Sequence, residues 1–378
     1  MSEGFGTSGN SDDAANSDST PAGVSRRNFL RDVAALTVTG SVLAGCARSA
    51  SAASSGAMSS TASGRAGLAS SIALKPTVDG IGVQLYTVAD QLRTDFDGTM
   101  EKVAQIGYKQ VEFAGYNNKT PEQVRALLDR LKLKSPSTHI GLDALRKDLD
   151  AQIHLAQVVG HEYITIPSLG RTETPMNTID AWKRISDECN TMGAKLKSHG
   201  LKLAFHSHSS EFVDVGGGKT GMDVFISETD PSVFNFQMDL GWARVASQDP
   251  VKWFKKYPDR FCMWHVKDFE NLRAAQDRET ITLRNAAAAT PRPASAAPPV
   301  APAGGVARGA AGGAPPAPQP GRPCPVGSGD VDFRPIIAEW KVSGMRYFFV
   351  EQDGAAQWPG GSMASIATSY QTLRRLLA

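Results

Sequence analysis

The chain has 378 residues and a net charge of +2, from 40 lysines and arginines against 38 aspartates and glutamates. The sequence lacks the basic stripe that proteins use to bind the phosphate backbone of nucleic acids, so no nucleic-acid partner is expected. Its four cysteines form no CxxC pair and no closely spaced framework, which argues against a zinc ribbon and a disulfide scaffold. The length accommodates one α/β barrel of about 250 residues with appendages.

The N-terminal part of the sequence is expected to be an export signal with flexible flanking segments rather than a folded region. Residues 1–24 are rich in Ser, Gly, Asp and Ala and are expected to be disordered, since they offer little apolar surface to bury. Residues 25–46 pair two arginines, Arg26 and Arg27, with a short apolar run, a layout that resembles the twin-arginine signal. The run is shorter than the roughly 20 residues that a membrane-spanning helix needs. Residues 47–79 are expected to form a flexible tether.

The end of this signal resembles the lipobox of bacterial lipoproteins. Leu43, Ala44 and Gly45 precede Cys46, which is the expected site of lipidation. The resemblance implies twin-arginine export machinery as a partner and a periplasmic or membrane-anchored lipoprotein, with membrane contact only through the lipid. The alternative is ordinary signal cleavage, which would release a soluble protein.

Residues 80–378 alternate short apolar strands with longer helical patterns, which predicts a single-domain (β/α)8 TIM barrel. A doubly wound sheet that binds nucleotides is less favoured, because neither GxGxxG nor GxxxxGK[ST] is present. The predicted strands are 81–86, 110–114, 134–139, 163–167, 201–206, 234–240, 261–267 and 346–351. The predicted helices include 96–106, 121–131, 145–159, 179–199 and 363–377.

A low-complexity insertion is assigned to residues 274–326, after the seventh strand. Its central part, 286–323, is almost entirely Ala, Pro and Gly and has no acidic residue, so it cannot build a core. We expect a mobile loop on the active-site side of the barrel. An inert insertion is favoured over a lid.

Period-two alternation assigns each strand an inward and an outward face. In the seventh strand, Cys262, Trp264 and Val266 are expected to face the helices. Polar side chains then point inward near the carboxyl ends of the strands, where barrels of this type build their active sites. This inward polar set is Gln84, Tyr86, Glu112, His206, His208, Gln237, Asp239, His265, Lys267 and Glu351.

Two imidazoles and two carboxylates in this set come from four successive late strands. They are His206, Asp239, His265 and Glu351. Nitrogen and carboxylate donors of this kind bind divalent transition metals. Since an unpartnered buried carboxylate or imidazole costs several kcal/mol, a shared cation gives a physical reason for their coincidence. One divalent ion is therefore predicted, with manganese, zinc, cobalt, iron and magnesium as the candidates.

Several motifs resemble the sugar phosphate isomerase/epimerase family with the xylose isomerase-like barrel. They are Gln237-Met238-Asp239-Leu240-Gly241-Trp242, Trp264-His265-Val266-Lys267-Asp268, the turn of residues 327–333 (GSGDVDF) and Val350-Glu351-Gln352-Asp353. The resemblance implies a metal, with manganese preferred, that is held by Glu, Asp, His and Glu, of which Asp239, His265 and Glu351 match the last three. His206 stands in place of the first glutamate. Two histidines separated by one residue, as His206 and His208 are here, also occur in inosose-dehydratase-like members. Those members eliminate rather than epimerise.

The resemblance implies proton abstraction next to a carbonyl group. Glu351 is the preferred base and Glu112 the alternate, while Lys267 is expected to stabilise the developing oxyanion. The residues expected to contact a small carbohydrate are Gln84, Tyr86, His139, His208, Trp242 and Arg244.

Three functions remain open from the sequence. The first is a metal-dependent isomerase or epimerase, and the second a lyase or dehydratase for keto-sugars or keto-glycosides. The third is an exported sugar-binding lipoprotein without catalysis. An endonuclease-like member is disfavoured by the near-neutral charge and the export signal. The sequence leaves the substrate and the oligomeric state undetermined.

Overall fold

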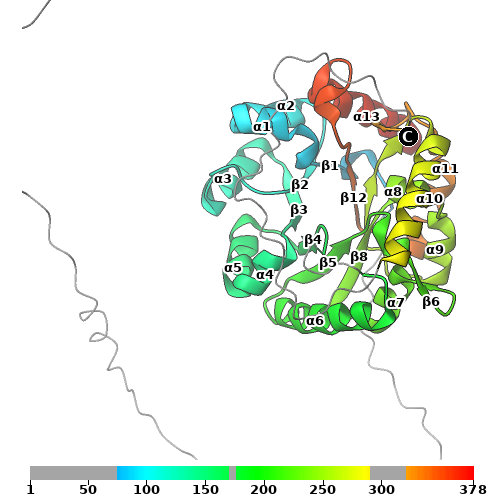
Figure 1. Ribbon diagram of the computed structural model, residues 1–378. Coiled ribbons are helices and arrows are strands. Elements are labelled where there is room, and N and C mark those ends of the chain that lie inside the picture. Colours follow the sequence, from blue (N-terminus) through cyan, green and yellow to red (C-terminus); the bar gives the residue numbers. More distant parts are fainter. Residues whose placement is uncertain (1–74, 170–175, 290–320) are drawn as a thin grey trace, which may run out of the picture. The chain divides into compact units, whose positions relative to one another are not determined.

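The computed structural model describes residues 75–169, 176–289 and 321–378. Within them, parallel strands close into a barrel in the order β1-β12-β9-β8-β5-β4-β3-β2, and helices surround the ring (Figure 1). The predicted (β/α)8 barrel is therefore confirmed. The barrel strands are β1 (Ile81–Gln84), β2 (Gln110–Phe113), β3 (Lys134–His139), β4 (Tyr163–Ile166), β5 (Lys202–His206), β8 (Phe234–Asp239), β9 (Met263–Val266) and β12 (Tyr347–Val350).

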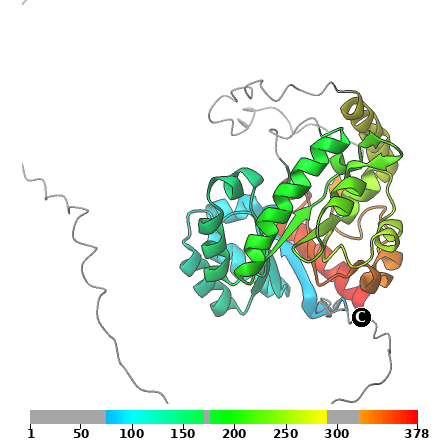
Figure 2. The ribbon, with the colours of Figure 1, turned by 90° about the horizontal axis from the view of Figure 1, so that it is seen from below.

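Helices follow the strands and cover the outside of the ring. Seen from below, the long helix α6 lies along the outer face of the barrel (Figure 2), where it contacts β5. The helices are α1 (Ala89–Thr94), α2 (Phe96–Ile106), α3 (Pro121–Leu131), α4 (Leu142–Lys147), α5 (Leu149–Val159), α6 (Ile179–Ser198), α7 (Gly221–Glu228), α8 (Leu240–Val245), α9 (Pro250–Lys256), α10 (Leu272–Ala288), α11 (Arg334–Ala338), α12 (Trp340–Ser343) and α13 (Gly361–Leu377).

One predicted helix is divided in two. The pattern over 145–159 predicted a single helix, but α4 and α5 are separated by Asp148, whose backbone is not helical, with φ −159° and ψ 83°. The Asp148 carboxylate accepts a hydrogen bond from the Ala151 amide at 2.9 Å. Aspartate favours this capping position over the interior of a helix, because its short side chain satisfies a free amide of the first turn.

The apolar core lies mostly between the strands and the surrounding helices, and a second small cluster fills the inside of the barrel. This inner cluster consists of Tyr163, Ala204, Cys262, Met263 and Phe349. Gly82 leaves room for it, since a Cβ atom there would lie 2.5 Å from the Phe349 ring. The prediction that Cys262 faces the helices is therefore wrong. Because β9 begins only at Met263, strand alternation does not extend to Cys262.

The predicted insertion is described only at its two ends. Its first part belongs to α10, and the C-terminal end of that helix is bonded to Asn177, whose side-chain amide donates to the Ala289 carbonyl at 2.6 Å. Its last part contains β11 (Pro323–Cys324), which pairs antiparallel with β10 (Asp268–Phe269). Residues 290–320 lie outside the described residues.

The predictions for the signal, the lipidation site Cys46 and most of the tether concern residues 1–74, which also lie outside the described residues. Among the described helices, none combines the length and the hydropathy needed to cross a membrane. The three cysteines in the described part, Cys189, Cys262 and Cys324, are buried and form no disulfide bond with one another.

Candidate functional site

Four side chains converge at the carboxyl end of the barrel. His206 ends β5, Asp239 ends β8, His265 lies in β9 and Glu351 follows β12. These strands are neighbours in the ring, so their ends meet on one side of it. One ligand atom from each side chain lies within 4.8 Å of the others, and all four residues are buried. The convergence predicted from strand alternation is therefore present.

Within the part of the chain that the structure describes, two buried atoms of this cluster have no hydrogen-bond partner. They are Nδ1 of His206 and Oδ2 of Asp239. The ion-pair distance from Asp239 Oδ2 to Lys267 Nζ is 3.2 Å, and to His206 Nε2 it is 4.0 Å. Leaving such atoms without a partner costs several kcal/mol, and a divalent cation bound among the four side chains would satisfy the Asp239 oxygen. The mixed set of imidazole and carboxylate donors thus fits a transition metal ion.

Burial shifts the protonation of the first two members of the cluster in opposite directions. It lowers the pKa of His206 well below its ordinary value, which keeps that imidazole neutral and able to donate a lone pair. It raises the pKa of Asp239 to about 6. The Asp239 carboxylate also caps α8, because Oδ1 accepts from the Trp242 amide at 2.8 Å.

His265 lies between two carboxylates. Its Nε2 contacts Glu112 Oε2 at 2.6 Å and its Nδ1 contacts Glu351 Oε2 at 2.8 Å. Burial alone would lower the pKa of His265, but Glu112 and Glu351 raise it to about 10. Of the two nitrogens, only Nδ1 faces Glu351, another candidate ligand, so Nδ1 is the nitrogen placed to bind an ion. Glu112 then fixes the proton on Nε2.

Both carboxylate oxygens of Glu112 accept hydrogen bonds. Its Oε2 atom accepts from Gln84 Nε2 at 2.9 Å, and its Oε1 atom accepts from Gln237 Nε2 at 2.8 Å. Burial alone would raise the pKa of Glu112, but His139 and His265 hold it well below its ordinary value. The side chain is fully buried. These contacts argue against Glu112 as the alternate base and favour a role in orienting His265.

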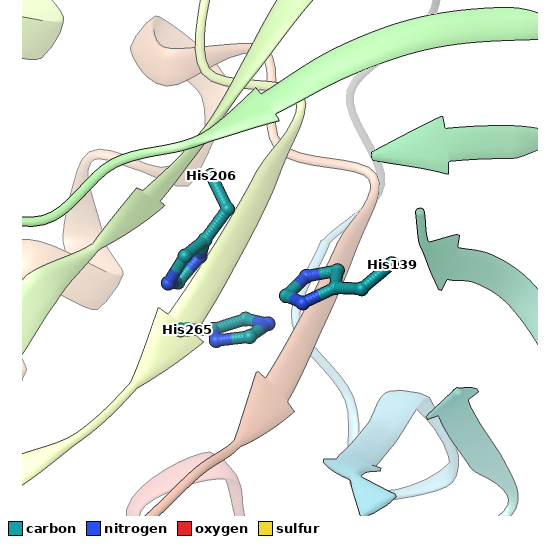
Figure 3. A group of neighbouring side chains, drawn as sticks. All are labelled: His139, His206 and His265. Carbon is teal, nitrogen blue, oxygen red and sulfur yellow. The ribbon is translucent and has the colours of Figure 1, made fainter. Parts of the chain in front are cut away.

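A third imidazole, that of His139, joins His206 and His265 (Figure 3). The rings of His139 and His265 lie nearly parallel, with centroids 5.4 Å apart, and the centroids of His206 and His265 are 4.3 Å apart. The ligand atoms of these three histidines also lie within 4.8 Å of one another. His139 Nε2 donates to Gln237 Oε1 at 2.9 Å, and Gln237 in turn donates to Glu112.

Lys267 is surrounded by carboxylates. Its Nζ atom lies 3.2 Å from Asp239, 2.9 Å from Glu351 and 2.8 Å from Asp353. Burial alone would lower the pKa of Lys267, but these three carboxylates raise it well above its ordinary value. Of these three carboxylates, Asp353 accepts a hydrogen bond from the ammonium group, and the other two form ion pairs with it. The contacts favour a role in holding Glu351 over the predicted role in stabilising an oxyanion.

Lys267 stabilises the charged form of the Glu351 carboxylate. Burial alone would raise the pKa of Glu351, but Lys267 and His265 hold it well below its ordinary value. Glu351 is 6% exposed, whereas Glu112 and Asp239 are 0% exposed. Among these three carboxylates it is therefore the one that a substrate reaches most easily.

The remaining predicted contact residues are placed unevenly. His208 and Trp242 lie beside the cluster, with ring centroids 4.6 Å from His206 to His208 and 6.1 Å from His208 to Trp242. Tyr86 lies beyond the end of β1, in a short 3-10 helix, and is 57% exposed. Arg244 donates to the Gln248 carbonyl at 3.2 Å, beyond the C-terminal end of α8. Asp239 caps the opposite, N-terminal end of this short helix.

Asp268 fixes the turn that carries the family-like GSGDVDF motif. Its carboxylate accepts hydrogen bonds from the backbone amides of Gly327, Gly329 and Val331 at 2.9 to 3.1 Å. A Cβ atom at Gly329 would lie 2.4 Å from this carboxylate, which explains the glycine. Asp268 is thus a structural residue that closes the loop next to Lys267.

Sequence reasoning did not assign two residues that the structure places in the site. Gln237 was expected to point inward but received no role, although it bridges Glu112 and His139. Asp353 occurred in a quoted motif, but nothing linked it to Lys267. Its position two residues after Glu351 was the one available signal, because it reaches the same end of the barrel.

Comparison with known proteins gives a consistent picture. A family model described as xylose isomerase-like TIM barrel matches residues 100–370. The inosose dehydratase of Lacticaseibacillus casei is 21% identical over 202 residues, which cover 49% of this chain and 67% of that protein.

Two solved structures are also similar. A sugar phosphate isomerase/epimerase from Parabacteroides distasonis ATCC 8503 matches with a TM-score of 0.57 at 20% identity, covering 79% of this chain and 94% of that chain. A protein named IolI with a bound zinc atom matches with a TM-score of 0.51 at 10% identity, covering 79% and 98%. At these identities the structural likeness shows the fold alone.

Proposed function

We propose, on the premise that this chain belongs to the xylose isomerase-like TIM barrel family, that it is a metal-dependent enzyme acting on a sugar or keto-sugar. The proposed reaction begins with removal of the proton next to the carbonyl group. The observation that carries the proposal is the buried cluster of His206, Asp239, His265 and Glu351, in which two atoms lack a hydrogen-bond partner among the described residues.

These four residues would hold a single divalent ion. When bound, the ion would hold the substrate carbonyl oxygen and lower the energy of the negative charge that develops there. Manganese is the preferred candidate, and the zinc-containing similar structure supports zinc as an alternative.

Glu351 is the proposed base. Its pKa is held well below its ordinary value, so its carboxylate is charged at neutral pH and able to accept a proton. Lys267 holds that carboxylate in place at 2.9 Å. Trp242 lies against Lys267, with its ring centroid 5.6 Å from Nζ, and would close the apolar side of the site.

Elimination is favoured over epimerisation as the outcome. A symmetrical epimerisation uses a second base on the opposite face of the substrate, and the position expected for it holds His206, which is buried and a candidate ligand. In an elimination, Glu351 accepts the alpha proton and the electrons of that C–H bond form a carbon–carbon double bond. The bond to the beta oxygen breaks, and the departing oxygen takes up a proton. Similarity to an inosose dehydratase supports this outcome.

A keto-glycoside with a chromophore tests the proposal. We expect the metal-loaded protein to release nitrophenol from a nitrophenyl 3-keto-glucoside, and Glu351→Gln to lower the rate by about 10³-fold or more. Asp332→Asn is the control, because that exposed carboxylate pairs with Arg334. In deuterated water, solvent deuterium in an epimerised product without release would indicate an epimerase. Binding of the keto-glycoside without deuterium exchange or nitrophenol release would indicate a sugar-binding protein and would contradict the proposal that the protein is an enzyme.

We also propose export by the twin-arginine route with lipidation at Cys46. The support is the sequence pattern of residues 25–46 alone. Labelling with a radioactive fatty acid in a bacterial host is the test, with Cys46→Ala as the variant that is expected to remain unlabelled and to leave the membrane fraction.

A further inference from the structure

We propose that the site selects uncharged sugars over phosphorylated ones and that Asp353 is the residue that sets this selection. This inference rests on the proposed function, because it names the substrate class of the same site. The residues that carry it are Asp353, Lys267 and the carboxylates around them.

A phosphate-binding site needs a cation or a set of amide donors that is free to meet the phosphate. Lys267 is the lysine at the centre of this site, and it is 1% exposed. Its ammonium group is held by Asp239, Glu351 and Asp353, all within 3.2 Å. A phosphate would have to displace at least one of these carboxylates in order to reach it.

The remaining basic groups near the cluster do not supply a replacement. The guanidinium of Arg244 bonds to the Gln248 carbonyl at the far end of α8. The imidazole of His208 is half-buried and lies beside the rings of His206 and Trp242, with centroids 4.6 and 6.1 Å away. Within the described residues around the cluster, carboxylates therefore outnumber cations. With a divalent ion bound and His265 neutral as one of its ligands, Glu112, Asp239, Glu351 and Asp353 outweigh Lys267 and the ion by one unit of charge.

Asp353 is the accessible member of this group. Its side chain is 39% exposed, whereas the side chain of Glu351 is 8% exposed and that of Asp239 is 0% exposed. An anionic substrate would therefore meet the Asp353 carboxylate first. Asp353 also occupies one of the three donors of Lys267. Its charge thus repels an anion and at the same time keeps the lysine unavailable.

Two keto-sugars that differ by one phosphate group test the proposal. We would titrate D-fructose and D-fructose 6-phosphate into the manganese-loaded protein by calorimetry. The unmodified protein is expected to bind D-fructose more tightly than its phosphate. Asp353→Asn is expected to improve binding of the phosphate by about tenfold relative to D-fructose, since a like charge is removed and Lys267 gains a free donor.

Asp332→Asn is the matched control. It also removes one negative charge, but from a carboxylate that is paired with Arg334, so the ratio of the two affinities is expected to stay unchanged. The proposal is overturned if the unmodified protein binds the phosphate as tightly as D-fructose, or if Asp353→Asn leaves the ratio unchanged. The nitrophenol assay reports separately on the proposed function. A protein that turns over the keto-glycoside and also binds the phosphate tightly would retain the function and lose only the charge selection.

Discussion

At the scale of single residues, the site is best understood through the side chains that hold the candidate ligands. Glu112 accepts hydrogen bonds from Gln84 and Gln237 and faces Nε2 of His265. This leaves Nδ1 of His265 directed towards Glu351. A histidine ligand whose second nitrogen is fixed by a carboxylate is more strongly basic and correctly oriented.

Glu112→Gln is therefore expected to weaken metal binding by about 10- to 100-fold, because a neutral amide does not fix the proton on Nε2 of His265. Competition with a metal chelator measures the affinity. Glu211→Gln serves as the control, since Glu211 is also a buried carboxylate but accepts from the His208 amide and the Ser210 hydroxyl. Equal affinities in the two variants would show that Glu112 does not position His265.

His161 makes folding sensitive to acid. It is buried, with Nδ1 at 2.7 Å from the Ser135 carbonyl oxygen and Nε2 at 2.7 Å from the Tyr116 hydroxyl. Burial lowers its pKa to about 4 from an ordinary value of 6.5. Since the unfolded chain binds this proton more readily, the stability is complete above about pH 6.5 and is lost as the pH falls towards 4.

We expect this residue to account for a loss of about 2 kcal/mol in the free energy of unfolding between pH 7 and pH 5. Urea unfolding at the two pH values, with the unmodified protein and His161→Gln, measures the difference. The variant is expected to be less stable at pH 7 but to lose less between the two values. A loss of the same size in both proteins would assign the acid sensitivity to other groups.

At the scale of elements, the break between α4 and α5 shows how one side chain ends a helix. The apolar spacing continues across residue 148, but the Asp148 backbone is not helical and its carboxylate caps α5. Asp148→Ala removes that cap, and we expect a loss of about 1 kcal/mol in the free energy of unfolding. Thermal or urea unfolding is the measurement. Lys147→Ala, at the exposed end of α4, is expected to change stability by less than about 0.5 kcal/mol.

At the scale of the whole molecule, a bound ion would tie together four strands of the barrel. The ligands come from β5, β8 and β9 and from the residue that follows β12, so an ion binds the folded chain and not the unfolded one. At a free metal concentration of 100 times the dissociation constant, linkage predicts a stabilisation of about 2.7 kcal/mol. A chelator should therefore lower the melting temperature.

His265→Ala is expected to abolish this response, because the protein would lose a central ligand and about one bound ion per chain. Elemental analysis and melting curves with and without chelator measure both effects. His199→Ala, a surface histidine after α6, is the control and should keep the response. A chelator effect that persists in His265→Ala would place the metal elsewhere.

The sequence by itself determined the barrel and the direction of its site. The alternation of strands and helices predicted the fold, because the apolar face of each element must pack against another layer. The two-residue repeat of side-chain direction in a strand predicted that His206, Asp239, His265 and Glu351 point inward. The predicted side-chain directions failed just outside the strands, since Cys262 precedes β9 and Tyr86 follows β1.

Only the tertiary structure decided which groups touch. The pairing of Lys267 with Asp353, and the enclosure of Glu112 by Gln84, Gln237 and His265, join residues far apart in the chain. Residue spacing carries no information on such contacts, since they depend on how the closed ring brings different strands and loops together. The physical reason is that local periodicity sets the face of each side chain, whereas charge pairing and burial depend on the assembled barrel.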